Sequence, residues 1–506
     1  MDEEREKIPQ TEAELEELVE KFEGKTRHLP GPAGQVIAAI LVVMSLYHLW
    51  ATNATIVTQI HRAVHLLFVL VLTFLLYPGW KDARTRIHAA DVLLALASVV
   101  ALGYILVDFN NFVYRSAIPN RLDMVFGVMT FLLVLEATRR AVGKALLFLV
   151  LAFIVYAFVG PHLPPPWTHR GYDLERLVGQ LYVALEGLFG VPIGVSATFI
   201  ILFTIYGSFL EQSGAGKFFV DLAFALTGRR RTGAGQAVTV ASFLLGGPSG
   251  SGVATTVTVG AIAYPLLRKA GYDRESAGGL LSAGGIGAVI SPPILGAAAF
   301  IIAEILKISY LEVLRMAVIP TVLYYLSIFM MIELDARRFG LRHVPIKAQN
   351  PWTLTVRYWY LLASLVLIPA FMLRGFTAIR AVLWTILLTW LTSYFRPETM
   401  LTPKKLVAAL ANGSKQVLNI AVTTAAAGII VGVVNLTGLG LKLSDIIVSL
   451  AGESLILTLI YSAIALWILG LALPITATYI IAAVIVAPAL IKLGVSELAA
   501  HMFIFY

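Results

Sequence analysis

The stretch GGPSGSGVAT, residues 246–255, decides the fold of this chain because it interrupts a long apolar segment at its centre. No charged residue lies between Arg231 and Arg268, yet glycine, proline and serine, which continue a helix poorly, fill the middle. Two full membrane crossings need about 40 residues plus a turn, and residues 234–267 are too few for that. Both flanks, GRRRTG and RKAGYDR, are basic and therefore expected in the cytoplasm. The sequence predicts a re-entrant hairpin of two short helices that meet at GGPSGSG.

Composition indicates a polytopic helical membrane protein. Of the 506 residues, 58% are hydrophobic and 13% charged, which is too apolar for a soluble protein of this length. The net charge of +8 comes from Lys and Arg in short loops between apolar runs, a pattern of membrane orientation rather than of nucleic-acid binding. Cysteine is absent, which excludes disulfides and thiolate metal sites. No GxSxG, HExxH or Walker motif is present, so we expect no enzyme and no cofactor beyond coupling ions.

The apolar runs predict an order of membrane segments. Spans are expected at 34–52, 63–80, 90–108, 122–138 and 144–160, then an interfacial helix at 172–190 and a crossing at 193–211. After the hairpin, crossings are expected at 276–305, 311–334, 355–373, 376–395 and 414–436. The loops KDARTR and RRAVGK each carry three basic residues, which predicts a cytoplasmic N-terminus. Residues 1–30 are expected to form an acidic cytoplasmic tail, with an amphipathic helix from Thr11 to Phe22.

A second interruption follows the hairpin in SAGGIGAVISPPILGAAAF, residues 282–300. This segment should cross the membrane, but its glycines and the pair Pro292 and Pro293 make a continuous helix improbable. Unwound backbone inside a membrane is tolerated only where it is buried in protein or lines a site. Two interrupted segments close in sequence therefore predict a binding site near the middle of the membrane in a secondary transporter.

An internal repeat gives the hairpin a partner. DLAFALTG at 221 matches DIIVSLAG at 445, and the next residues match with a similar offset, so GLALPITATYIIAAVIVAPALIKLG predicts a second hairpin that breaks at LPITAT. Basic residues flank the first copy and are few around the second, and five crossings lie between them, so the two copies are expected to be inverted. Shifted by the same offset, the SPP break would fall beyond Tyr506. We therefore expect the natural protein to be longer, with a second repeat that is incomplete here.

These residues resemble a known family. Residues 246–294 resemble the first hairpin and broken helix of the large membrane subunit of tripartite ATP-independent periplasmic (TRAP) transporters, and residues 188–233 resemble the part before it. The four spans within 31–141 resemble the small membrane subunit fused in front, as in the TAXI branch, which leaves 142–506 as the transport domain with inverted repeats at about 193–305 and 414–506. The resemblance implies a bacterial or archaeal cytoplasmic (inner) membrane, an extracytoplasmic TAXI-type binding protein as partner, and elevator-type movement.

The interrupted segments offer backbone carbonyls and hydroxyls but no Asp, Glu or His. Such neutral oxygens suit sodium, whereas a proton-coupled carrier would need a titratable group near the site. The N-termini of the half-helices suit a carboxylate. The candidate binding residues are Gly247, Ser249, Gly250, Ser251, Thr255, Gly287, Ser291, Pro292, Pro293, Pro474, Thr476 and Thr478, with Ser249, Ser251 and Ser291 as sodium ligands.

The expected function is sodium-coupled uptake of small organic carboxylates, dicarboxylates or glutamate-like, delivered by the binding protein. Two alternatives stay open at this point: a stand-alone ion-coupled carrier of the wider hairpin superfamily, and a passive channel or structural membrane protein. Single glycines from Gly284 to Gly287 can also serve close helix packing alone.

Other polar residues in the spans favour structural roles. Thr423, Thr424 and Asn435 are expected to form hydrogen bonds between helices, and Glu136 to form an ion pair with the adjacent Arg139 and Arg140. His61, His65 and His501 show no metal-ligand spacing, so no metal role is expected for them.

Overall fold

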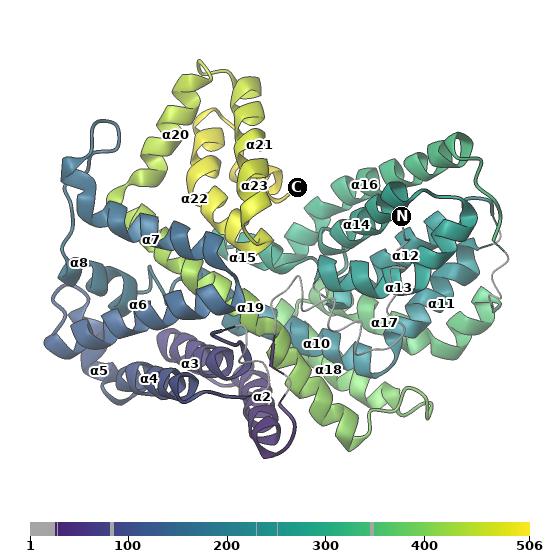
Figure 1. The fold of residues 1–506 in the computed structure, drawn as a ribbon, viewed down its shortest axis with the longest axis horizontal. Helices are drawn as coiled ribbons and strands as arrows, with labels where there is room; N and C mark the ends of the chain where they lie inside the picture. Colours follow the sequence, from purple (N-terminus) through teal and green to yellow (C-terminus); the bar gives the residue numbers. More distant parts are fainter. Residues whose placement is uncertain (1–25, 28, 81–85, 229, 250, 345–348) are drawn as a thin grey trace, which may run out of the picture. The chain divides into compact units, whose positions relative to one another are not determined.

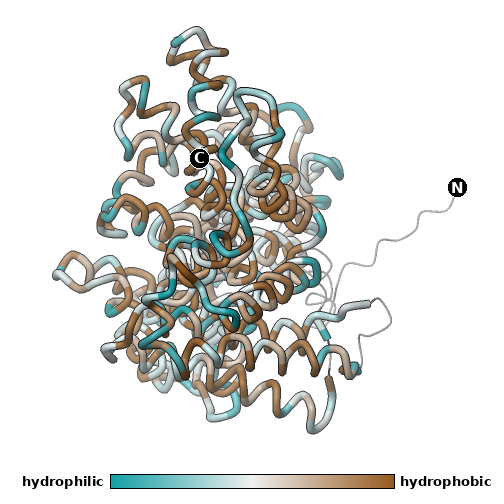
Figure 2. Tube along the Cα trace, turned by 90° about the vertical axis from the view of Figure 1, so that its left-hand side faces the viewer, coloured by the Kyte–Doolittle hydropathy of each residue, from teal (hydrophilic) through white to brown (hydrophobic). Residues whose placement is uncertain are grey.

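The computed structural model describes residues 26–27, 29–80, 86–228, 230–249, 251–344 and 349–506, and within these residues the chain forms helices and no strand (Figure 1). The expected helix from Thr11 to Phe22 lies outside them. Ten helices of this described part are long and apolar enough to cross a membrane, and the hydrophobic colour in Figure 2 follows helical segments. The all-α polytopic fold class is confirmed.

The chain folds into two compact units. The described residues of the first unit lie within Leu202–Gly296 and Ser309–Gly413, and those of the second lie within Thr26–Ile201, Ala297–Ile308 and Ser414–Tyr506. The chain therefore leaves the second unit after Ile201, re-enters it briefly after the SPP break, and returns to it finally at Ser414.

The second unit begins with helices close to the predicted spans. They are α2 (Pro32–Ala51), α3 (Thr58–Leu76), α4 (Ala89–Val107), α6 (Arg121–Ala141) and α7 (Lys144–Val159). The largest shift is in α3, which starts five residues before the predicted span. The first turns of α3 carry the polar residues Gln59, His61 and Arg62. A prediction from hydropathy leaves such residues out of the span, although all three lie inside the helix.

The same arrangement of a buried aspartate and an arginine links the start of each of the helices α4 and α6 to the end of the other or to the chain just after it. Asp91 near the start of α4 and Asp123 near the start of α6 each complete a capping box at the third helical position. Each also accepts hydrogen bonds from an arginine: Asp91 from Arg140 at the end of α6 (2.6 Å), and Asp123 from Arg115 shortly after α4 (2.6 Å). Both aspartate side chains are fully buried. The two helix ends are thus held by paired charges rather than by apolar packing alone.

The predicted interfacial helix at 172–190 is only half right. Helix α8 (Leu174–Val178) continues as the π-helix η3 (Gly179–Val183), and the chain then turns back, with the amide of Leu188 donating to the carbonyl of Leu181 (2.8 Å). A Cβ on Gly187 would lie 2.3 Å from the Cα of Leu181, so the turn requires glycine there. The predicted crossing at 193–211 is present as α9 (Val191–Val195), the π-helix η4 (Ser196–Ile200) and α10 (Ile201–Gln212).

The repeat found in the sequence is a repeat of helices. In the first unit it comprises α11 (Ala215–Thr227), α12 (Gly233–Ser249), α13 (Gly252–Ala270) and α14 (Arg274–Val289); in the second, α20 (Leu439–Leu450), α21 (Leu455–Ala472), α22 (Ile475–Lys492) and α23 (Glu497–Phe505). Helices α11 and α20 both follow a glycine with left-handed backbone, Gly214 (φ 78°) and Gly438 (φ 68°). Helices α14 and α23 are both capped by the residue before them, Asp273 and Ser496. The opposite orientation of the two copies stays a prediction.

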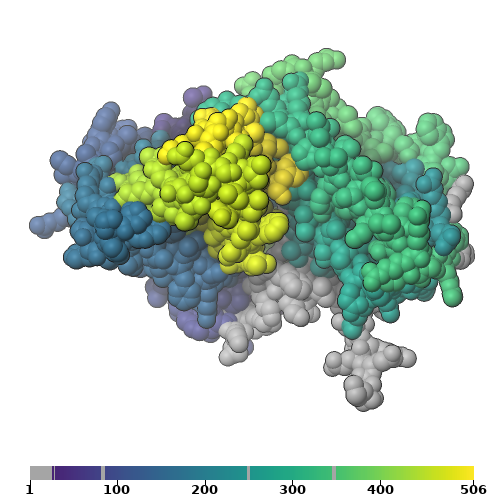
Figure 3. All heavy atoms as spheres, turned by 90° about the horizontal axis from the view of Figure 1, so that it is seen from above, coloured from purple at the N-terminus to yellow at the C-terminus, as the bar shows by residue number. Residues whose placement is uncertain are grey.

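Helix α21 has a largely exposed apolar surface. The exposed fractions are 89% for Leu471, 74% for Trp467 and 70% for Ile456, and the yellow-green atoms of this part of the chain lie at the surface in Figure 3. A helix that is apolar on its exposed side fits a lipid environment.

Five further helices lie in the chain between the two copies of the repeat: α15 (Ala297–Leu306), α16 (Tyr310–Arg338), α17 (Pro351–Leu373), α18 (Ala378–Ser393) and α19 (Pro403–Thr437). The predicted crossings at 311–334, 355–373 and 376–395 correspond to α16, α17 and α18. Helix α19 begins before the predicted position 414. The prediction missed its first turns because they are polar, with Lys404, Lys405 and Asn412 among them.

Candidate functional site

The first hairpin is formed as predicted, with a narrower break. Helix α12 runs through Gly246 and Gly247 to Ser249, and α13 starts at Gly252. The Oγ of Ser251 caps α13 by accepting a hydrogen bond from the amide of Ala254 (3.1 Å). Residue 250 and the side chain of Ser249 lie outside the described part, so their assignment to the site stays a prediction.

Thr255 lies in the first turn of α13, where its Oγ1 donates to the carbonyl of Ser251 (2.8 Å). Its side chain is fully buried. The two described hydroxyls of this hairpin tip, on Ser251 and Thr255, therefore both bond to the backbone around the start of α13. They help to define the shape of the tip, and their part in ion binding stays a prediction.

The following helix is broken where the sequence predicts it. Helix α14 ends at Val289 and α15 begins at Ala297, with non-helical backbone from 290 to 296. The amide of Gly296 donates to the carbonyl of Val289 across this break (2.6 Å). The hydroxyl of Ser291 donates to the carbonyl of Gly287, which directs the lone pairs of its oxygen away from that carbonyl. The Pro292–Pro293 peptide bond is cis.

Glycines press the broken helix between the two arms of the hairpin. A Cβ on Gly246 of α12 would lie 1.7 Å from the Cβ of Ala288, and one on Gly285 would lie 2.5 Å from the carbonyl oxygen of Gly252 in α13. No real Cβ atom tolerates such distances. Close packing therefore accounts for glycine at Gly246 and at Gly285, and for Gly285 this agrees with the packing alternative.

The break lies against both α12 and α16. A Cβ on Gly247 would lie 3.4 Å from the Cβ of Ile294, so the end of α12 reaches the unwound segment. A Cβ on Gly287 would lie 2.9 Å from the hydroxyl of Tyr325 on α16. The structure thus brings Gly247, Gly287 and the SPP segment together within the first unit. The contribution of α16 has no counterpart among the residues singled out from the sequence.

The second hairpin breaks at LPITAT as predicted. Pro474 is the residue before α22, and the hydroxyl of Thr478 donates back to its carbonyl (3.2 Å), while the side chain of Thr476 is buried. Helix α22 packs against α15 and α23. Within the second unit, the half-helix after the SPP break therefore lies beside an arm of the second hairpin. A buried hydrogen bond of 2.7 Å between the hydroxyl of Tyr479 and Nδ1 of His501 joins α22 to α23.

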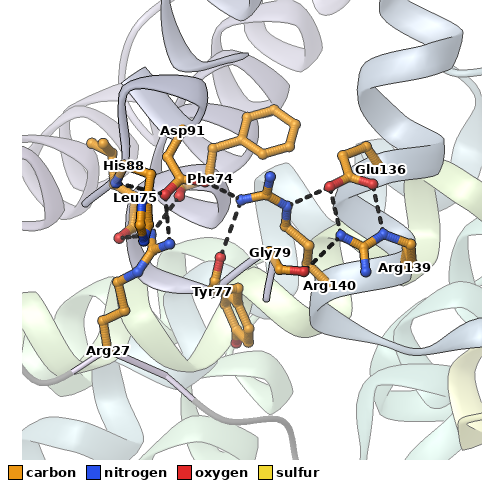
Figure 4. A network of polar contacts seen from close by, with 10 residues as sticks. All are labelled: Arg27, Phe74, Leu75, Tyr77, Gly79, His88, Asp91, Glu136, Arg139 and Arg140. Atoms are coloured by element: carbon orange, nitrogen blue, oxygen red, sulfur yellow. Dashed lines mark hydrogen bonds and ion pairs between the residues drawn. The ribbon is translucent and has the colours of Figure 1, made fainter. Parts of the chain in front are cut away.

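A buried network of charges lies at one end of the N-terminal helices (Figure 4). The predicted ion pairs of Glu136 are confirmed, with oxygen-to-nitrogen distances of 2.7 Å to Arg139 and 2.6 Å to Arg140. Sequence reasoning missed the centre of the network, which is Asp91. Its carboxylate lies 2.6 Å from both Arg140 and Arg27, and the side chains of these three residues are at most 1% exposed.

The arginines of this network also cap α3. The guanidinium of Arg27 donates to the carbonyls of Phe74 and Leu75 (both 2.9 Å), and that of Arg139 donates to the carbonyl of Gly79 (3.0 Å). Carbonyls at the end of a helix lack partners within the helix and carry partial negative charge. The network therefore fixes the end of α3 to the start of α4 and the end of α6, and its role is structural.

Three buried polar residues join the N-terminal helices to the η4 segment. Nδ1 of His48 lies 2.7 Å from the carbonyl of Met44, its Nε2 lies 2.8 Å from Nδ1 of His65, and Nε2 of His65 lies 3.0 Å from Oγ of Ser196. Because a carbonyl only accepts, Nδ1 of His48 must donate. With neutral rings, every later bond is then oriented: His65 donates to His48, and Ser196 donates to His65.

Further side chains of α3 bond to irregular backbone. Gln59 donates to the carbonyl of Val183 (2.7 Å), Arg62 to that of Phe189 (2.6 Å), and Nε2 of His61 lies 3.0 Å from that of Ala197. No group of His, Cys, Asp or Glu in the described residues could hold a metal ion. The histidines of α2 and α3 thus act here as hydrogen-bonding side chains.

The comparison with known families decides the class of protein. A family profile described as "Tripartite ATP-independent periplasmic transporter, DctM component" matches residues 129–506, which include both hairpins and the break. The chain belongs to this family. A search of curated proteins finds no match. Membership of the TRAP family makes the chain a permease component of a secondary transporter rather than an enzyme, a multi-pass membrane protein, and the partner of an extracytoplasmic substrate-binding protein.

Proposed function

We propose that this TRAP permease drives uptake of small organic carboxylates, dicarboxylate or glutamate-like, with an inward sodium gradient. The substrate is delivered by a TAXI-type binding protein, and the hairpin domain moves as an elevator against a scaffold. In this proposal residues 31–141 are a fused small subunit, residues 142–506 are the transport domain, and the N-terminus lies in the cytoplasm of the cell whose inner membrane holds the protein.

The unwound segment at Ser291, Pro292 and Pro293 carries the proposal. In the part of the chain that the structure describes, the carbonyl oxygens of Pro292 and Pro293 take no hydrogen bond, and proline has no amide hydrogen with which to offset them. Backbone carbonyls without donors at membrane depth are costly unless a ligand uses them. Sodium is the coupling ion that prefers such neutral oxygen ligands, and the oxygen of Ser291, whose hydrogen goes to the carbonyl of Gly287, keeps lone pairs that suit a cation.

Helix N-termini support a carboxylate as the substrate group. Helices α13, α15 and α22 all begin directly after one of the breaks, at Gly252, Ala297 and Ile475. Free amides and the positive end of the helix dipole at such positions favour an anion. Thr476 and Thr478 at the start of α22, and Thr255 at the start of α13, are the side chains that we assign to substrate recognition.

The test is uptake into proteoliposomes that contain the full chain, with and without a sodium gradient and with and without the binding protein. Uptake should require both, and Ser291→Ala should raise the sodium concentration at half-maximal rate. Ser98→Ala is a matched control, because Ser98 is buried in α4 and also donates to the carbonyl four residues earlier. Unchanged sodium dependence in both Ser249→Ala and Ser291→Ala would remove the ligand assignment, and flux without any gradient would remove the carrier itself.

A further inference from the structure

Helix α16 carries a stripe of hydroxyls that follows the broken helix. The hydroxyl of Tyr324 donates to the carbonyl of Ala283 (2.9 Å), and Oγ1 of Thr321 donates to the carbonyl of Ile290 (3.2 Å). The hydroxyl of Tyr310 accepts from the amide of Leu295 (2.9 Å). Positions 310, 321 and 324 fall on one face of a helix, since their separations are close to three and four turns. One face of α16 therefore bonds to the backbone before, at the start of and at the end of the break.

These bonds account for backbone groups that the break releases. The carbonyl of Ile290 lies just after the end of α14, and the amide of Leu295 lies just before the start of α15, where no helical turn precedes it. Thr321 supplies a donor to this carbonyl and Tyr310 an acceptor to this amide, and both side chains are buried, at 8% and 3% exposed. The amide of Gly296 donates a hydrogen bond to the carbonyl of Val289. The carbonyls of Pro292 and Pro293 in the middle of the break are left without donors in the described chain.

We propose that Thr321 and Tyr310 are positioning residues for the coupling ion, a step that rests on the proposed sodium site. They fix both ends of the unwound segment against the rigid helix α16, so that the carbonyls of Pro292 and Pro293 and the oxygen of Ser291 are held ready for the cation. A site held in its binding geometry before the ion arrives loses less conformational entropy on binding. Neither residue touches the ion, so their removal should weaken sodium binding and leave the fold in place.

The experiment measures sodium binding without transport. The purified full chain is unfolded thermally in a titration of sodium chloride against choline chloride at constant ionic strength, and the rise in midpoint gives the sodium concentration at half-saturation. Thr321→Val, which keeps the shape and removes the hydroxyl, should raise this concentration about 5-fold, which corresponds to the loss of one hydrogen bond. Thr321→Ser should restore it to within about 2-fold, and Tyr310→Phe should raise it as Thr321→Val does. Thr385→Val is the matched control, because the buried hydroxyl of Thr385 donates within its own helix α18.

The outcomes separate this inference from the proposed function. If sodium stabilises the wild-type protein and Thr321→Val binds it with unchanged half-saturation, the positioning role is wrong and the sodium site stands. A lower midpoint in Thr321→Val without any change in half-saturation would make α16 a structural brace only, which also overturns the inference. If sodium does not stabilise the wild type more than choline does, the sodium site itself fails, and the positioning role fails with it.

Discussion

Asp91→Asn tests whether the buried charge network stabilises the N-terminal helices. Asp91 lies between Arg27 and Arg140, with all three side chains at most 1% exposed. Asparagine keeps the size and one acceptor oxygen, so the bond from the amide of His88 (3.0 Å) can persist. The side-chain amide nitrogen of the new asparagine would face one of the two guanidinium groups, and no hydrogen bond forms there because both groups are donors. Both buried arginines would then face a neutral side chain at position 91, while Arg140 keeps its ion pair with Glu136.

Removing one charge from a buried ion pair costs about 3–5 kcal/mol, because the partner charge stays buried while its ionic attraction to that group is lost. For a unit of this size we expect the apparent unfolding midpoint to fall by roughly 6–10 °C. The assay is thermal unfolding of the purified protein in detergent or nanodiscs at fixed pH and salt. Asp445→Asn is the control: its partner Lys492 lies 2.8 Å away, but the two side chains are 64% and 58% exposed. An exposed pair contributes about 0–1 kcal/mol, so the control should shift the midpoint by at most about 2 °C.

The double variant sharpens the test. Asp91 and Arg140 bind each other directly, so either single substitution already removes their interaction. The free-energy cost of Asp91→Asn combined with Arg140→Gln should therefore be clearly less than the sum of the two single costs. A midpoint for Asp91→Asn within the range of the exposed control, or strictly additive effects in the double variant, would refute the claim that the network is a coupled buried unit.

Three other substitutions have expected outcomes by the same unfolding assay. Gly246→Ala should destabilise the first unit by about 1–3 kcal/mol, since the added Cβ would lie 1.7 Å from the Cβ of Ala288. Gly278→Ala in α14 is the control, and it should be neutral or stabilising because the space around its Cβ is open. Equal effects of the two substitutions would contradict the close packing at Gly246. His65→Ala should lower the free energy of unfolding by about 2–4 kcal/mol, because it removes a hydrogen-bond partner from His48 and from Ser196, both buried. His343 is exposed, so His343→Ala should change the free energy of unfolding little. A similarly small effect of His65→Ala would contradict the oriented chain of hydrogen bonds. Asp273→Ala, which removes the cap of α14, should cost about 1 kcal/mol, while Asp273→Asn keeps the cap and should cost less; equal losses would point to charge rather than capping.

The cap of α14 also has a pH dependence with a definite sign. The hydrogen bond from the amide of Ser276 lowers the pKa of Asp273. A carboxylate whose pKa is lower in the folded protein stabilises the fold above its unfolded pKa, and this contribution is lost as the pH falls through the folded value. Because Asp273 is only partly buried, salt should weaken the effect.

The repeat was predictable because its signal is local and occurs twice. Gly214 and Gly438 stand at matching positions before matching helices, and the break between α12 and α13 and the break before α22 both fall where the sequence has residues that continue a helix poorly. The ends of the spans were less predictable wherever polar side chains lie inside a helix, as at the start of α3. Hydropathy treats Gln59 as a loop residue, although its partner is a carbonyl 124 positions away in the chain.

Partners across long separations account for most of what the sequence could not show. Asp91 and Arg27 are 64 residues apart, and His65 and Ser196 are 131 apart, so no spacing rule joins them. The reverse error also occurs. The hydroxyls of Thr423 and Thr424, expected to bond between helices, donate to carbonyls of their own helix α19, and Asn435 is exposed. A threonine in a helix has such a carbonyl always within reach, so interhelical bonding cannot be inferred from its presence in a span.

The N-terminal helices complete the backbone hydrogen bonding of the family-matched part. The family match begins at residue 129, so α2, α3 and α4 precede it. Yet the carbonyls of Val183, Phe189 and Ala197, in the irregular stretch from η3 to η4, take their bonds from side chains of α3. Backbone carbonyls at membrane depth need such donors. Side chains of α3 bond to three of these carbonyls, so we expect this helix to stabilise the stretch that ends where the chain leaves the second unit, after Ile201.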